Sequence, residues 1–164
     1  MSDNEINYSR PEIDEIGQLV SLWMRLADGQ RKFGSDVSVT ENRTQIQDVI
    51  AQHIVDDQIW VARTDSQIIG FVLYTTEEGY YVLSEARGII RDLYVKQDYR
   101  SQGVGSHLLD RAEMSLSGAG VTVIILDSMA DNSAARDFYQ SHDYTVHRVT
   151  YRKDIENDTH SKGE

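Results

Sequence analysis

Apolar positions recur along the first half of the chain with the spacing of helices and then of strands. They return every three or four residues over 13–27 and again after Thr40, which predicts two amphipathic helices. Asp28 and Gly29 are expected to begin the loop between these helices, and Thr40 is expected to cap the second one. Shorter apolar or alternating runs predict three strands, over 6–9, 59–63 and 68–75. The last two strands flank a polar turn and indicate a hairpin.

The second half of the chain alternates strands with helices. A strand over 87–95 is followed by a glycine-containing loop and then by a helix with an apolar face. A continuous β-branched run over 121–126 is typical of a strand that is covered on both faces. Residues 133–141 predict another helix, which Asn132 or Ser133 caps.

Two further segments complete the expected order of elements. Residues 144–152 predict a last strand, whereas 80–83 fit either a short strand or part of a long loop. The resulting order predicts an α/β fold in which a mixed sheet carries helices on both faces. The length favours one domain over 1–153, and the polar, acidic residues 154–164 are expected to form a disordered tail.

The composition narrows the classes of protein and of chemistry. The chain of 164 residues contains no cysteine, which excludes disulfides, thiolate metal sites and a cysteine nucleophile. Its five histidines show no compact ligand spacing, so we expect no metal site. No apolar run approaches the ~18 residues of a membrane span, and the acidic N-terminus does not fit a secretory signal. We therefore expect a cytoplasmic protein that does not bind membranes.

The formal net charge of −11 disfavours nucleic-acid binding, which needs a basic surface that displaces counterions. Two interpretations of this acidity stay open. An acidic groove would attract a cationic acceptor. Alternatively, a solvated acidic surface would suit a halophilic source with an acidic proteome, because molar salt screens the mutual repulsion of the charges. Lysine is rare and acidic residues are spread along the chain, which favours the second interpretation.

The most informative stretch joins the strand over 87–95 to the next helix. It reads Arg-x-x-Gly-x-Gly from Arg100 to Gly105. The first amides of a helix lack intrahelical partners and point outward, and the helix dipole adds positive potential at that end. Glycine lets the backbone approach phosphates without a Cβ in the way. This order of strand, loop and helix therefore predicts a cradle for a diphosphate.

A second motif, Asn-x-x-Ala-x-x-Phe-Tyr, begins at Asn132 and ends at Tyr139. With the two motifs at this separation, the chain resembles the GNAT acyltransferase superfamily from its first strand to about Lys153. The resemblance is sharpest over 89–144. It implies the GNAT fold and an N-acetyltransferase that uses acetyl-CoA and an amine acceptor, without a metal.

The resemblance also implies where coenzyme A binds. In this family the strands that correspond to 93–95 and 122–126 splay apart, and the pantetheine arm lies between them. Backbone groups of the first strand bind the arm and polarise the thioester carbonyl, and the amides of about 102–106 hold the diphosphate. The cofactor-binding residues expected on this basis are Leu93, Tyr94, Val95, Arg100, Ser101, Gln102, Gly103, Val104, Gly105, Ser106, Asn132 and Tyr139.

For the chemistry, the resemblance points to Tyr139 as the general acid that protonates the leaving thiolate. The general base stays open. Asp127 corresponds to a glutamate of ribosomal-protein alanine acetyltransferases, whereas Arg91 replaces the glutamate of other members and cannot act as a base. Glu85 and Asp92 are further candidates, although strand alternation would send Asp92 to the face opposite Arg91. A base that acts through water, or no dedicated base, also fits.

The function expected from this resemblance is direct acetyl transfer to a primary amine in a ternary complex. The acceptor could be a small amine, a polyamine, an aminoglycoside-like compound, a protein N-terminus or a lysine. Its specificity is expected to come from the first helices and from residues 29–39 and 76–85, which carry no readable motif. The alternatives are a non-catalytic acyl-CoA-binding sensor or interaction module on the same fold, and a different acyl donor. Homodimers are common in the family, but the sequence shows no interface.

Overall fold

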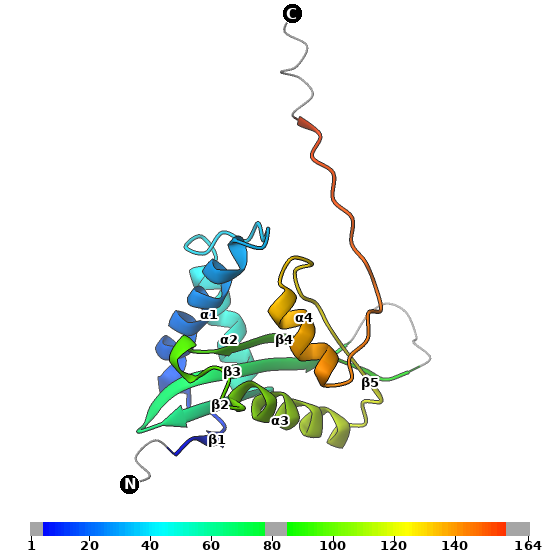
Figure 1. Cartoon of the computed structure of the whole chain (residues 1–164). Helices are drawn as coiled ribbons and strands as arrows, with labels where there is room; N and C mark the ends of the chain where they lie inside the picture. Colours follow the sequence, from blue (N-terminus) through cyan, green and yellow to red (C-terminus); the bar gives the residue numbers. More distant parts are fainter. Residues whose placement is uncertain (1–4, 78–84, 157–164) are drawn as a thin grey trace, which may run out of the picture. The chain divides into compact units, whose positions relative to one another are not determined.

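The computed structural model describes residues 5–77 and 85–156. They form two units, one that ends at Asp131 and one that begins at Asn132, and each is described by itself. The single-domain organisation stays a prediction. The described part of the second unit contains one helix. The α-helices and strands of the first unit follow in chain order (Figure 1): β1 (Asn7–Ser9), α1 (Ile16–Arg31), α2 (Arg43–Val55), β2 (Ile59–Thr64), β3 (Gln67–Thr76), β4 (Arg87–Val95), α3 (Val104–Gly118) and β5 (Val123–Leu126).

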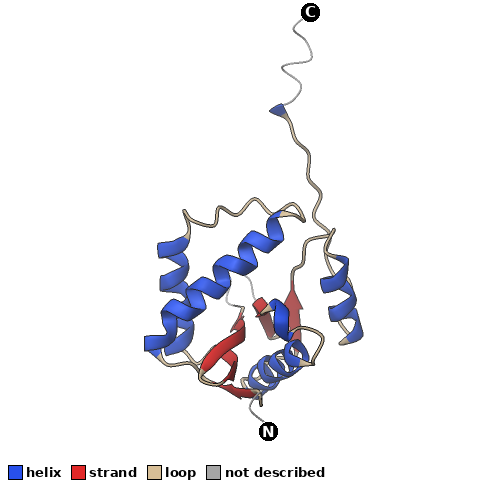
Figure 2. Ribbon diagram, turned by 60° about the vertical axis from the view of Figure 1, so that its left-hand side comes forward, coloured by secondary structure: helices blue, strands red, loops and turns tan. Residues whose placement is uncertain are grey.

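The strands of the first unit form one mixed sheet in the order β1-β2-β3-β4-β5. The pairs from β1 to β4 are antiparallel, and β5 runs parallel to β4. Helices α1 and α2 cover one face of the sheet and α3 covers the other (Figures 1 and 2). The predicted mixed sheet with helices on both faces is therefore confirmed.

The main core lies between the sheet and the pair α1 and α2. It forms because the apolar positions of both helices fall on one face, as their spacing predicts, and meet the inward-facing residues of β2 and β3. Burial of each such side chain contributes roughly 1.5–3 kcal/mol to the free energy of unfolding. The buried residues of this core are Leu19, Val20, Leu22, Ile46, Ile50, Ile59, Val61, Ile68, Phe71 and Leu73.

The ends of the first two helices differ from the prediction. Helix α1 continues through Asp28 and Gly29 to Arg31, so the loop begins later than expected. A glycine inside a helix costs about 1 kcal/mol, which the packing of the neighbouring buried turn outweighs. Helix α2 begins at Arg43 with Asn42, not Thr40, as its N-cap. The Asn42 side-chain amide instead donates to the Ser38 carbonyl at 2.6 Å and ties down the preceding turn.

Two predicted strands differ from the structure. Residues 144–152 form no strand, and apolar side chains after Tyr144 are exposed, with 65% of Val146 and 91% of Tyr151 accessible. Alternating apolar residues favour a strand, but a strand forms only where a partner backbone is available. Strand β5 is shorter than predicted, and all four of its residues are partly exposed rather than covered on both faces. The expected element at 80–83 lies outside the described residues.

The second unit contains α4 (Ser133–Ser141). The sequence left Asn132 and Ser133 open as its cap, and the structure assigns the cap to Asn132, whose Oδ1 accepts from the Ala135 amide at 3.1 Å. No helix of the described part of the chain is both long and apolar enough to cross a membrane.

Candidate active site

Strand β4 has an open edge beyond the point where β5 ends. Strand β5 pairs only with the first four residues of β4, although β4 continues to Val95. On its other side β4 stays paired with β3 to that end, and the Lys96 amide then donates to the Ile69 carbonyl at 2.8 Å. Because backbone groups of successive residues alternate in direction, those of Leu93 and Val95 face the side from which β5 has departed. This open edge is where an extended ligand can bind backbone groups.

The carboxyl end of β4 is held by Arg100. Its Nε donates to the Val95 carbonyl at 2.7 Å, and its guanidinium carbon lies 5.4 Å from the centre of the Tyr94 ring. The arginine of the glycine motif therefore fixes the strand that precedes the loop. The sequence indicated Arg100 as a cofactor-binding residue but showed no sign of this bond to the strand.

The loop between β4 and α3 has the backbone of an anion-binding turn. Ser101 and Gly103 have φ angles of 64° and 85°, and α3 begins at Val104. A Cβ on Gly103 would meet only the His107 ring, at 3.7 Å, so the glycine is required by its conformation and not by lack of space. The N-cap of α3 is Gly103, which has no side chain that could bond to the first turn of the helix. That the amides of this turn bind an anion stays a prediction from the sequence.

The first turn of α3 is anchored by His107, which the sequence analysis missed. Its Nδ1 lies 2.7 Å from the Gly103 carbonyl oxygen, and its ring stacks on Tyr8 of β1 with 5.2 Å between ring centres. Val104, at the start of the helix, is buried against the rest of the unit. A histidine one turn into a helix carries no sequence signal for such a contact, because its partner Tyr8 is distant in the chain.

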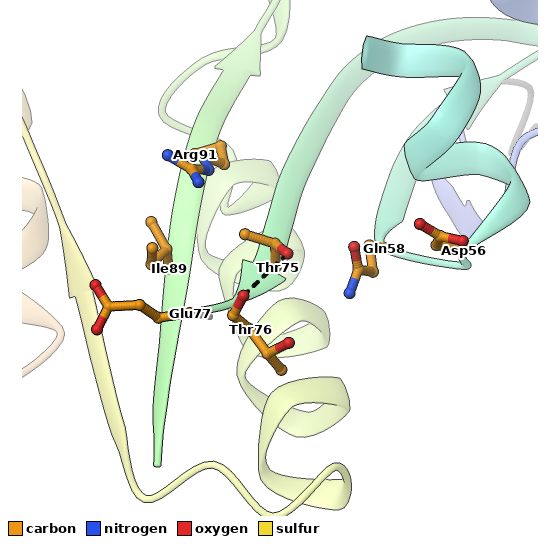
Figure 3. A pocket seen from close by; sticks show the side chains of 7 residues that line it. All are labelled: Asp56, Gln58, Thr75, Thr76, Glu77, Ile89 and Arg91. Carbon is orange, nitrogen blue, oxygen red and sulfur yellow. Dashed lines mark hydrogen bonds between the residues drawn. The ribbon is translucent and has the colours of Figure 1, made fainter. Parts of the chain in front are cut away.

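A pocket of about 510 Å³ lies at the other end of β4, where β3 ends and β4 begins (Figure 3). Its size suits a small molecule or a single side chain. Within the described residues its lining is polar and carries two carboxylates and one guanidinium. The lining residues are Asp56, Gln58, Thr75, Thr76, Glu77, Ile89 and Arg91.

The charges of this pocket are only partly paired. Glu77 lies 3.9 Å from the guanidinium of Arg87. Arg91 is exposed and makes no hydrogen bond or ion pair with other described residues, and Figure 3 shows it on β4 next to Ile89. The pocket thus offers two carboxylates and an exposed guanidinium to a ligand that carries charge.

The expectation that Asp92 faces away from Arg91 is wrong. Leu73 pairs with Asp92 and Tyr74 pairs with Ile90, so Arg91 is an extra residue in β4 at a β-bulge. Residues directly opposite each other share a face, which puts Asp92 beside Leu73 on the face that α1 and α2 cover. The bulge interrupts the alternation on which the expectation rested.

Asp92 is a largely buried carboxyl. Burial raises its pKa from 3.8 to about 6, while a hydrogen bond from Trp23 of α1 and the nearby charge of Arg91 act in the opposite direction. The desolvation of the charged form is the dominant effect. At neutral pH the group is ionised and still close enough to its pKa to take up a proton.

The remaining predicted residues lie on both units. In the first unit, Asp127 directly follows β5 and is exposed, and Glu85 is exposed just before β4. In the second unit, Tyr139 lies on α4, where its ring contacts those of Phe138 and Tyr144 at centre distances of 5.3 Å and 5.9 Å. The structure thus brings the residues of β4 and of the glycine motif together, and it describes Asn132 and Tyr139 separately from them.

The mixed sheet that opens beside β4 and the glycine-containing turn that begins α3 are consistent with the fold of an acyltransferase. Over residues 23–144 the chain matches the Acetyltransferase (GNAT) family, and it belongs to that family. It is an acetyl-CoA-dependent acyltransferase.

The chain is also similar to a relative of known activity and, in its fold, to solved structures. The chain is 26% identical over 152 residues to the peptidyl-lysine N-acetyltransferase YjaB of Salmonella typhimurium, and the match covers 92% of this chain and 89% of that protein. It resembles the crystal structure of a GCN5-related N-acetyltransferase from Ralstonia eutropha with a TM-score of 0.74, at 17% identity and with 91% and 98% of the two chains covered. A predicted acetyltransferase from Clostridium acetobutylicum, solved with acetyl-CoA, has a TM-score of 0.71 at 16% identity and 93% and 98% coverage.

Proposed function

We propose that this protein transfers the acetyl group of acetyl-CoA to a primary amine by direct attack within a ternary complex. The observation that carries the proposal is the continuity of the open edge of β4 with the turn that begins α3. One ligand can bind along both, with a chain of hydrogen-bonding groups at the strand and a diphosphate at the helix. Coenzyme A has this shape and these groups.

The donor would bind as follows. The outward-facing amides of residues 102–106 hold the diphosphate, with the positive end of the helix dipole behind them. The backbone of Leu93 and Val95 binds the pantetheine arm and orients the thioester carbonyl. Arg100 stabilises this arrangement because its bond to the Val95 carbonyl holds the end of the strand against the loop.

The pocket at the start of β4 is the site we assign to the acceptor. Arg91 and Ile89 line it and also flank the point where β5 leaves β4, so an amine in the pocket lies next to the inner end of the open edge. Asp56 and Glu77 can attract an ammonium group. One relative, YjaB of Salmonella typhimurium, acts on a peptidyl lysine by its name, so peptide amines are the first acceptors to test.

Tyr139 is the proposed general acid that protonates the leaving thiolate, and Asn132 the proposed contact to the pantetheine arm. Both follow from their places in the second motif. Asp127, at the carboxyl end of β5, is the base that the motif position predicts. The cytoplasmic location and a homodimer likewise stay predictions.

The test measures coenzyme A release from acetyl-CoA over a panel of polyamines, aminoglycosides, lysine peptides and N-terminal peptides. Wild type runs beside Tyr139→Phe, with Tyr151→Phe as the matched control, since Tyr151 is 91% exposed in the same unit. We expect turnover with one amine class, a loss of roughly 100- to 10,000-fold in Tyr139→Phe, and wild-type rates in the control. Equal rates in all three proteins would remove Tyr139 from its role. Binding of acetyl-CoA without turnover for any amine would favour a sensor of acyl-CoA instead.

A further inference from the structure

Arg91 differs from the other charged side chains of the acceptor pocket because it has no partner among residues 5–77 and 85–156. The two carboxylates of the pocket are both engaged. Asp56 accepts a hydrogen bond from Nε2 of Gln52 at 3.0 Å, and Glu77 lies 3.9 Å from the guanidinium of Arg87. The chain has 27 acidic and only 16 basic residues, so carboxylates to pair with Arg91 are not scarce. Its exposed guanidinium is therefore available to a ligand.

The position of Arg91 is set by the irregularity of β4. Arg91 is the extra residue of the β-bulge, so no residue of β3 lies opposite it. Bulges redirect a side chain and are frequent next to active sites. Both Arg91 and Ile89 line the pocket (Figure 3). The charge of Arg91 acts on its neighbour Asp92, but the described part of the chain shows no ion pair between them. The bulge thus adds a guanidinium to the wall of the pocket.

The opposite side of the pocket has the opposite polarity. Asp56 and Gln58 precede β2, Arg91 lies on β4, and Thr75 of β3 lies between them, since β3 separates β2 from β4 in the sheet (Figure 3). The pocket therefore presents a cation on one side and a carboxylate and an amide on the other. A volume of about 510 Å³ can hold a small molecule with an anionic end and a polar or cationic end.

Arg91 also lies close to the place where the reaction is proposed to occur. The last pair between β4 and β5 joins Ile90 to Leu126, so Arg91 is the first residue of β4 beyond it. The thioester is proposed to lie along this open edge, beside Leu93. An anion that binds Arg91 and an amine that attacks the thioester must then be near each other in the acceptor. The carboxylate and amine of an α-amino acid are attached to the same carbon, whereas polyamines and peptide N-termini lack this neighbouring carboxylate.

We propose that Arg91 binds the carboxylate of the acceptor, and that the acceptor is a free α-amino acid whose side chain extends toward Asp56 and Gln58. The inference rests on the proposed acetyltransferase function and deepens it by naming the substrate class. The planar guanidinium matches a carboxylate with two parallel hydrogen bonds. The carboxylates of the pocket favour a cationic side chain, such as that of arginine.

The reaction on this acceptor is acetylation of the α-amine. The nitrogen forms a bond to the acetyl carbon, and the carbon–sulfur bond breaks. The ammonium group gives up two protons in all, of which the leaving sulfur takes one and solvent the other. The products are an N-acetylamino acid and coenzyme A. Arg91 takes no part in the proton transfers, and its role is to hold the amine beside the thioester.

The experiment compares amino acids with their amides in the coenzyme A release assay. Arginine and argininamide come first, because each has a single primary amine, and pairs with polar and apolar side chains follow. Wild type should favour the acid over the amide roughly 10- to 100-fold in kcat/KM, which is the effect of one charge-assisted contact. Arg91→Gln should bring the ratio to about one without slowing the amide, and Arg91→Lys should give an intermediate ratio, because lysine keeps the charge but not the planar fork.

The control is Arg148→Gln, which removes the same charge from an exposed position of the second unit and should keep the wild-type ratio. The α-amines of an acid and its amide differ in basicity, but this difference is the same for every protein, so the change in ratio between proteins reports Arg91 alone. Circular dichroism checks that each variant folds. Calorimetry with arginine and argininamide in the presence of coenzyme A should show the same loss of preference in Arg91→Gln without any turnover.

The outcomes separate this inference from the proposed function. Equal kcat/KM for acids and amides in wild type, or an unchanged preference in Arg91→Gln, overturns the inference and leaves the acetyltransferase function standing. Acetylation of polyamines or lysine peptides, with no free amino acid accepted, has the same consequence. If Arg91→Gln does not fold, an undiminished preference in Arg91→Lys overturns the inference instead. Absence of acetylated product from every amine in wild type contradicts the proposed function itself.

Discussion

Burial of the Asp92 carboxyl reduces the stability of the fold at neutral pH, and this gives a prediction that does not depend on activity. The pKa of Asp92 is about 6 in the folded protein and 3.8 as the reference for the unfolded chain. This difference corresponds to about 3 kcal/mol, at 1.36 kcal/mol per decade. The folded state binds the Asp92 proton more tightly than the unfolded state does. The resulting stabilisation is therefore complete below pH 3.8 and is lost as the pH rises through about 6.

Asp92→Asn removes this dependence because the amide stays neutral at every pH. Its carbonyl oxygen can still accept the hydrogen bond of Trp23. At pH 8 we expect the variant to be more stable than wild type, by up to about 3 kcal/mol less the cost of placing the new NH₂ group. Between pH 8 and pH 5.5 the difference in free energy of unfolding between the variant and wild type should shrink by roughly 0.8 kcal/mol. This change comes from the titration of Asp92 alone.

The assay is urea unfolding followed by tryptophan fluorescence and circular dichroism at several pH values between 5.5 and 8. Asp110→Asn serves as the control for the loss of one negative charge from an acidic protein, since this carboxyl is exposed on α3. The reasoning is refuted if the stability difference between Asp92→Asn and wild type is the same at both ends of the pH range. It is also refuted if wild type gains stability relative to the variant as the pH rises.

Four further predictions concern the cradle, the second unit, the core and the charge. Gly103→Ala should lower the free energy of unfolding by about 1–2 kcal/mol, because alanine is strained at a φ of 85°, and should weaken coenzyme A binding in calorimetry; unchanged values would mean that the turn relaxes. Asn132→Ala should cost about 1 kcal/mol and reduce the helix signal of α4, because the Ala135 amide loses its cap, and an unaltered signal would contradict this. Phe71→Ala, which empties a fully buried position, should cost about 3–5 kcal/mol in urea unfolding, and a loss under 1 kcal/mol would show that the core closes over the gap. If the acidity reflects adaptation to salt, the thermal midpoint should rise from dilute buffer to molar potassium chloride, and a constant midpoint would reject that interpretation.

The cradle could be predicted from the sequence because its requirements are local. The strand that ends at Val95, the glycine at a left-handed position and the apolar face of α3 all lie within one short stretch, and each leaves a pattern in the residues. The main core could be predicted for the same reason, since helical spacing alone identifies the buried faces of α1 and α2. Both depend on neighbours in the chain.

The features that sequence reasoning missed depend on partners that are distant in the chain. The bulge at Arg91 arises from the register between β3 and β4 and has no composition signal, so alternation gave the wrong face for Asp92. The bond from Trp23 joins α1 to a strand that follows about seventy residues later, as the residue numbers show. The same holds for the predicted strand over 144–152. Its residues suit a strand, but their pairing depends on the rest of the fold.

The most direct test of the central claim is mass spectrometry of the amine panel after incubation with purified protein and acetyl-CoA. The account predicts that one class of primary amine gains a single acetyl group, that coenzyme A is released in equal amount, and that neither product forms without the protein. The account is contradicted if the protein binds acetyl-CoA and yet no amine in the panel, from polyamines to lysine and N-terminal peptides, gains an acetyl group.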